Sequence, residues 1–179
     1  MVWYFAFFFI SGFCSILYEL VWLRLSMAQF GVTTAQVSIV LSVFMAGLGV
    51  GSWIAGILSR RYGDRISFHP LRLYALAEFL IGCSALAVPV QLLWGRRLLE
   101  SLSQQVTLSS AAYYLVSGSL VALIIVPWCA CMGATIPLAM SAIRSDSRNR
   151  TSRSFSFLYL SNVAGAVAGG IVPLFLIEL

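Results

Sequence analysis

The longest uncharged stretch of this chain covers residues 25–59, 35 residues without Asp, Glu, His or Arg. About 20 apolar residues carry one helix across a bilayer, so this stretch is long enough to cross, turn and nearly cross again. Four further uncharged runs cover residues 1–18, 79–95, 101–143 and 154–177. The chain is therefore expected to fold within a membrane.

The composition indicates the same solvent. Hydrophobic residues make up 60% of the 179 residues and charged residues only 9%, too few to cover the exterior of a water-soluble fold, so lipid is the expected partner of much of the surface. The uncharged runs are continuously apolar rather than alternating, which favours helices over barrel strands. We therefore predict an all-α, polytopic integral membrane helix bundle.

Hydropathy and turn residues divide the chain into five expected helices within one transmembrane domain, residues 1–179. Their expected ranges are 2–28, 34–59, 71–94, 110–141 and 155–178. Gly31 permits an unusual backbone angle at the first turn, and Thr33 or Thr34 is expected to cap the helix that follows. A longer polar connection is expected from Trp94 through Gln105, with a short amphipathic helix as one option for it.

The positive charges predict the orientation. All eleven basic residues are arginines, and eight fall into two groups: Arg60, Arg61, Arg65 and Arg72, then Arg144, Arg148, Arg150 and Arg153. By the positive-inside rule both groups are expected in the cytoplasm, which places the N-terminus there and Leu179 on the opposite side. A bacterial inner membrane is the expected location, and nucleic acid is not an expected partner.

Small residues recur every four positions in two of the expected helices. Gly47 and Gly51 lie in the second, and Gly165 and Gly169 lie in the last. Small residues let helices approach closely in lipid, where no hydrophobic effect drives them together. These stripes are expected to pack within the chain or to dock onto another subunit.

Polar residues inside the apolar runs are candidate functional groups: Tyr18, Glu19, Arg24 and Glu78. An intramembrane charge costs about 2.5–3.5 kcal/mol on insertion scales, so each carboxylate needs compensation. Arg24 lies five residues after Glu19, about 140° around a helix, so polar partners of Glu19 are expected from other helices. For Glu78 an interhelical hydrogen bond, a protonated state, a wet cavity and a cation or proton site all stand as alternatives.

Catalytic and cofactor motifs are not recognised. The glycine-rich stretch 47–52 lacks both the G-x-G-x-x-G spacing and the G-K-[ST] ending of a phosphate loop. His69 stands apart from other candidate ligands, and no nucleophile, base and acid can be assembled. We expect no enzyme activity, no cofactor and no metal.

Six motifs resemble the membrane domain of spermidine-synthase-like polytopic proteins. They are Ser11-Gly12-Phe13, Tyr18-Glu19-x-x-Trp22-x-Arg24, Phe30-Gly31, Phe44-Met45-x-Gly47-Leu48-x-x-Gly51-Ser52, Met132-Gly133-Ala134-Thr135-Ile136-Pro137-Leu138 and Leu158-Tyr159-x-x-Asn162-x-x-Gly165-Ala166. The resemblance implies a partial major-facilitator helix bundle, which in that family is often followed by an aminopropyltransferase domain. No such domain is expected within this chain.

The loop after the second expected helix resembles a gating motif of major-facilitator transporters. The matching residues are Gly56, Arg60, Arg61, Gly63, Asp64 and Arg65. Arg60 stands where the family has an acid, so we interpret this loop as a basic determinant of topology rather than a gate.

Three hypotheses of function follow. The first is a non-catalytic structural or accessory subunit that packs onto a larger membrane complex. The second is a half-transporter that binds a small cation such as a polyamine at Glu19 and Glu78 and works with a second copy of the chain. The third is the membrane anchor of a spermidine-synthase-like enzyme.

Overall fold

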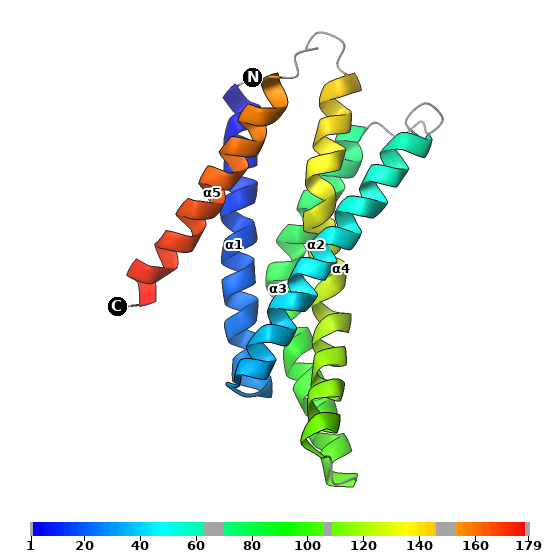
Figure 1. Cartoon of the computed structure of the whole chain (residues 1–179), viewed down its shortest axis with the longest axis vertical. Helices are drawn as coiled ribbons and strands as arrows, with labels where there is room; N and C mark the ends of the chain where they lie inside the picture. Colours follow the sequence, from blue (N-terminus) through cyan, green and yellow to red (C-terminus); the bar gives the residue numbers. More distant parts are fainter. Residues whose placement is uncertain (1, 63–69, 106–108, 146–152, 178–179) are drawn as a thin grey trace. The chain divides into compact units, whose positions relative to one another are not determined.

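The computed structural model describes residues 2–62, 70–105, 109–145 and 153–177, and these residues form five α-helices (Figure 1). The helices are α1 (Val2–Phe30), α2 (Thr34–Tyr62), α3 (Pro70–Gln105), α4 (Ser110–Ser145) and α5 (Arg153–Ile177). Each contains a segment long and apolar enough to cross a membrane. The predicted all-α membrane fold is confirmed for the described part of the chain.

The third helix differs from its predicted range of 71–94. It continues to Gln105, so the separate connection expected from Trp94 is wrong. The cause is a buried stripe, Leu92, Gly95 and Leu99, which keeps one face of the helix in contact with neighbours beyond the apolar run. Hydropathy alone does not register such a stripe, because arginines and other polar residues fill the rest of the turn.

The helices belong to two compact units. The first unit contains α1 up to Val21 together with α5, and the second contains residues 22–145. α1 is continuous through the division at Val21 and Trp22. The expectation of one transmembrane domain stays a prediction.

In the second unit α2 and α4 run parallel. Gly118 lies against Ile39, Gly47 against Val126, and Gly51 against Ala130, so the positions rise together along both helices. α3 runs antiparallel to α4, because Gly95 lies near Ile124 while Gln91 hydrogen-bonds Trp128 farther along. The ends of α2 and α4 and the start of α3 therefore share one end of the unit.

Apolar side chains fill the interior of this unit. Trp22 and Phe44 meet edge to face, with ring centroids 6.1 Å apart, in the antiparallel hairpin that the end of α1 forms with α2. The fully buried apolar residues of α3 and α4 are Val88, Leu92, Val121, Ile125 and Cys129. α3 also packs near the end of α1, since a Cβ at Gly95 would lie 3.4 Å from Phe30 Cζ, and α3 continues beyond that level to Gln105.

The turn between α1 and α2 has the predicted chemistry. Gly31 adopts a φ of 104° and its N–H donates to Met27 O at 2.9 Å, which ends α1 with a left-handed residue. Thr33 Oγ1 accepts from Gln36 N at 3.2 Å and so caps α2. The roles expected of Gly31 and Thr33 are confirmed.

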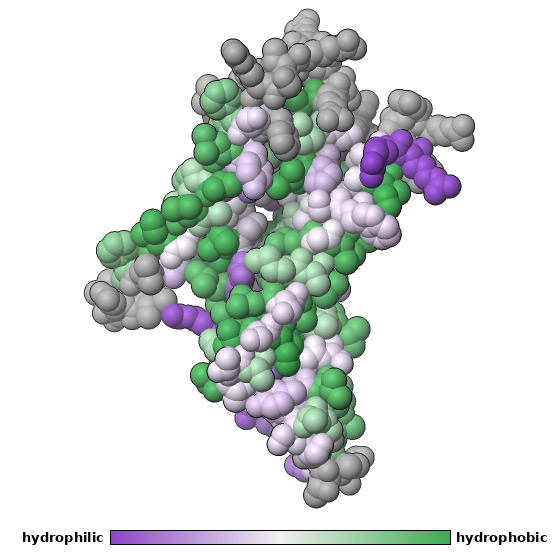
Figure 2. Space-filling view, in the orientation of Figure 1, coloured by the Kyte–Doolittle hydropathy of each residue, from purple (hydrophilic) through white to green (hydrophobic). Residues whose placement is uncertain are grey.

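The surface fits a lipid solvent. Figure 2 shows apolar residues over much of the visible face and a strongly hydrophilic patch at the upper right, where α2 ends in Figure 1. Arg60 and Arg61 lie in the last turn of α2, and both are exposed. These observations are those of an integral membrane protein; its membrane and orientation stay predictions.

Candidate functional site

The first unit is held by small residues at the contact of α1 and α5. A methyl group at Gly165 would collide with the carbonyl oxygen of Phe9, and one at Gly169 would lie 2.5 Å from the carbonyl oxygen of Phe13. Asn162 Nδ2 donates to Phe8 O at 3.1 Å. This face is therefore a close backbone contact that larger residues would separate.

The second unit uses the same chemistry between α2 and α4. A Cβ at Gly47 would lie 2.5 Å from Cys129 Cβ, and one at Gly51 would collide with the backbone of Ala130. From the other side, a Cβ at Gly133 would collide with the carbonyl oxygen of Leu48. Glycines on both helices thus interlock, so the contact tolerates added volume at none of these positions.

The predicted intramembrane polar residues are divided between the two units. Tyr18 and Glu19 are half-buried in the first unit, whereas Arg24 is exposed and Glu78 half-buried in the second. Glu78 hydrogen-bonds the Tyr74 side chain one turn earlier in α3, so one of its partners is a neutral residue of its own helix. The interhelical partners expected for Glu19 stay a prediction.

The predicted basic loop is described only in part. Arg60 and Arg61 lie in the last turn of α2, and Arg60 Nε donates to Gly56 O at 3.2 Å. Asp64 and Arg65 lie outside the described residues. The hydrogen bond of Arg60 closes the last turn of its own helix, which suits a helix-ending role.

A polar cluster that the sequence reasoning missed lies near the α1–α2 turn. Ser26 and Gln36 are completely buried, and among the described residues Ser26 Oγ, Gln29 Oε1 and both amide atoms of Gln36 have no hydrogen-bond partner. Elsewhere in this unit the buried hydroxyls bond to their own helix, as Thr135 Oγ1 does to Met132 O at 2.7 Å. The available signal was Gln36 within an otherwise apolar i, i+4 stripe with Val40 and Phe44.

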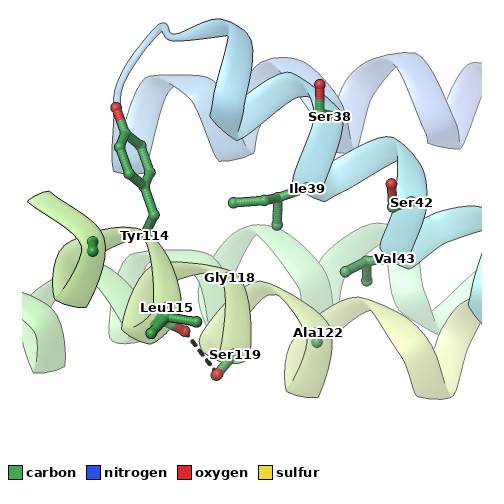
Figure 3. Close-up of a pocket in the computed structure, with 10 residues that line it drawn as sticks. Ser38, Ile39, Ser42, Val43, Tyr114, Leu115, Gly118, Ser119 and Ala122 are labelled. Carbon is green, nitrogen blue, oxygen red and sulfur yellow. Dashed lines mark hydrogen bonds between the residues drawn. The ribbon is translucent and has the colours of Figure 1, made fainter.

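A shallow groove of about 780 Å³ follows the outer side of the α2–α4 contact. Ile39 and Val43 project from α2 toward α4, and Gly118 lies below them on α4 (Figure 3). Ser119 Oγ uses its hydrogen bond within α4, to Leu115 O at 2.7 Å. The lining is apolar and hydroxylic with no charged residue, which suits apolar surface rather than an ionic ligand.

In the described ranges, no group of three or more His, Cys, Asp or Glu side chains converges. The four cysteines are not joined in disulfides: Cys14, Cys83, Cys129 and Cys131. The contact faces and the α2–α4 groove are therefore the structural features that a function can be built on.

Comparison of the chain with protein-family models, with curated proteins and with solved structures gives no significant match. The resemblance to the spermidine-synthase-like membrane domain and to major-facilitator bundles therefore stays a prediction.

Proposed function

We propose that this protein is a non-catalytic membrane subunit that docks onto a transmembrane helix of another membrane protein. The observation that carries the proposal is an exposed face of α2, which we call the open α2 face: Ser38, Ser42, Gly49 and Gly56, with the exposed Met45 between Ser42 and Gly49. Spacings of four and seven residues put its members on one side of the helix. A Cβ at Gly49 or Gly56 would meet no atom within 4 Å.

The opposite side of the same helix shows what such a face does. Gly47 and Gly51 bring α2 against α4, as described above. Successive residues of a helix are separated by 100°, so Gly47 and Gly51 point nearly opposite to Gly49 and Gly56. Since small residues permit close helix approach in lipid, the open α2 face is suited to a further transmembrane helix.

The α2–α4 groove supports the same partner. It borders the open α2 face at Ser38 and Ser42, and its apolar floor matches the side chains of a transmembrane helix. The serine hydroxyls can hydrogen-bond across such a contact without any charge on the partner. An uncharged helix with small residues on one side is the partner that this chemistry fits.

Two open glycines give a matched test. Gly49 and Gly82 both have no atom within 4 Å of an added Cβ, so Gly49→Leu and Gly82→Leu should leave the fold intact. We expect Gly49→Leu to lose a stoichiometric membrane partner on purification in mild detergent and Gly82→Leu to retain it. Loss in both variants or in neither contradicts the proposal.

Photo-crosslinking in intact membranes identifies the occupant. A photoreactive residue at Ser42 should give one protein adduct of defined mass, while one at Leu86, which is 81% exposed on α3, should give none. Adducts with lipid alone at both positions count against a docking face. An adduct with a second copy of the chain supports the half-transporter instead, and a soluble enzyme as the partner supports the anchor.

A further inference from the structure

The α1–α2 hairpin brings polar side chains together in a buried place. Trp22, Ser26 and Gln29 are spaced by four and three residues and so share one face of α1. The ring contact of Trp22 with Phe44 fixes the antiparallel register of the hairpin. In this antiparallel register Ser26 is level with Val40, and Gln29 is level with Val37, the residue next to Gln36.

The polar atoms of this cluster lack protein partners among the described residues. They are Ser26 Oγ, Gln29 Oε1, Gln36 Oε1 and Gln36 Nε2. Ser26 and Gln36 have 0% of their surface exposed. A buried amide or hydroxyl without a hydrogen bond is costly, and the hairpin register places these four atoms within about one helical turn of one another on two facing helices, which points to a shared ligand.

The donor and acceptor set selects the ligand. It combines two amide oxygens and a hydroxyl with the NH₂ group of Gln36, and it includes no carboxylate. A cation would be repelled by the amide hydrogens and would gain no charge neutralisation in an apolar surrounding. Water donates to the oxygens and accepts from the NH₂ group at no charge cost, and internal waters typically have two to four polar partners.

We infer that Ser26, Gln29 and Gln36 form an internal water site that ties the end of α1 to the start of α2. The backbone of this segment is satisfied separately, because Gln36 N donates to Thr33 Oγ1. The side-chain amide of Gln36 is therefore available to the water. The site is independent of the open α2 face, and neither proposal depends on the other.

The direction in which Gln36→Met changes the unfolding midpoint tests the site. If Gln36 is hydrated, Gln36→Met removes its hydrogen bonds and leaves Ser26 and Gln29 without partners, so the unfolding midpoint in detergent should fall by about 2–4 °C or more. If the amide is dry and unpaired, methionine of similar length relieves a cost, and the midpoint should rise. An unchanged or raised midpoint overturns the inference. Gln104→Met, at an exposed position of α3, is the control and should leave the midpoint unchanged.

Two measurements on the unaltered chain do not depend on the variant folding. A structure at a resolution that shows ordered water should place one within hydrogen-bond distance of Ser26 Oγ and the Gln36 amide. A direct bond between the Gln29 and Gln36 amides with no water overturns the inference. Replacing NaCl by choline chloride at equal ionic strength should leave the midpoint unchanged, and a sodium-dependent midpoint reassigns the site to a cation.

Discussion

The hydroxyl of Tyr113 donates a 2.7 Å hydrogen bond to the carbonyl oxygen of Phe30, which joins the start of α4 to the last residue of α1. The last carbonyls of a helix have no partner within that helix. Tyr113 therefore completes the end of α1 from a different helix, 83 residues along the chain.

Tyr113→Phe should lower the free energy of unfolding by about 1 kcal/mol, because only the hydroxyl and its hydrogen bond are removed. Chemical or thermal unfolding in detergent measures the loss. Tyr114→Phe removes the neighbouring hydroxyl, which lines the α2–α4 groove, and serves as the control. Equal losses in the two variants would show that the hydrogen bond to Phe30 O adds no more stability than the hydroxyl of Tyr114 does.

Adjacent glycines of α5 should respond oppositely to alanine. A Cβ at Gly169 lies 2.5 Å from Phe13 O, whereas a Cβ at Gly170 lies 3.8 Å from Ile16 Cγ2, an ordinary contact. Gly169→Ala should cost about 1–3 kcal/mol through overpacking. Gly170→Ala should be neutral or stabilising, since alanine favours a helix over glycine. Thermal unfolding of both variants decides, and equal midpoints would mean that α5 does not meet α1 closely.

The same comparison applies to α2. Gly51→Ala should destabilise the second unit by about 1–3 kcal/mol, because its methyl group meets the Ala130 backbone. Gly49→Ala adds the same group where no atom lies within 4 Å and should not destabilise the isolated protein. A greater loss at Gly49 than at Gly51 in detergent would reverse the assignment of the two faces.

The exposed ion pair of α3 should contribute little. Arg96 Nε and Glu100 Oε1 are 2.7 Å apart, with about half of each side chain exposed. Exposed pairs of this spacing contribute about 0.3–0.5 kcal/mol. Glu100→Gln should therefore change the free energy of unfolding by no more than that, and the change should shrink at high salt. A loss of several kcal/mol would show that this turn is shielded from water.

Single thiols test the predicted orientation. In a variant without the native cysteines, Arg61→Cys at the end of α2 and Ser103→Cys near the end of α3 should react with a membrane-impermeant reagent from opposite sides. The reason is that the two positions lie at opposite ends of the second unit. Labelling of both from the same side would contradict the five-crossing topology. Ser67 and Ser147, where introduced cysteines would probe the arginine-rich loops, lie outside the described residues.

The helices were predictable because each apolar run exceeds a membrane thickness, and Gly31 and Thr33 mark a turn in the sequence itself. The end of α3 was not, because Gly95 and Leu99 stay buried through contacts from other helices that hydropathy does not contain. The polar cluster was not predictable for the same reason, because it depends on contacts between helices. In the sequence, Ser26 and Gln36 are ordinary polar residues of apolar helices. Only the packed structure shows that both are buried and that, among the described residues, their side chains lack hydrogen-bond partners.

The length of α3 beyond Gly95 has a practical consequence. Gly95 is level with Phe30, where α1 ends, and the helix continues to Gln105. At 1.5 Å per residue this extension reaches about 15 Å farther. It carries Arg97, Glu100 and Gln104, all exposed. We therefore expect residues 96–104 to form a helical epitope outside the bilayer, and antibody binding to intact membranes from that side measures it.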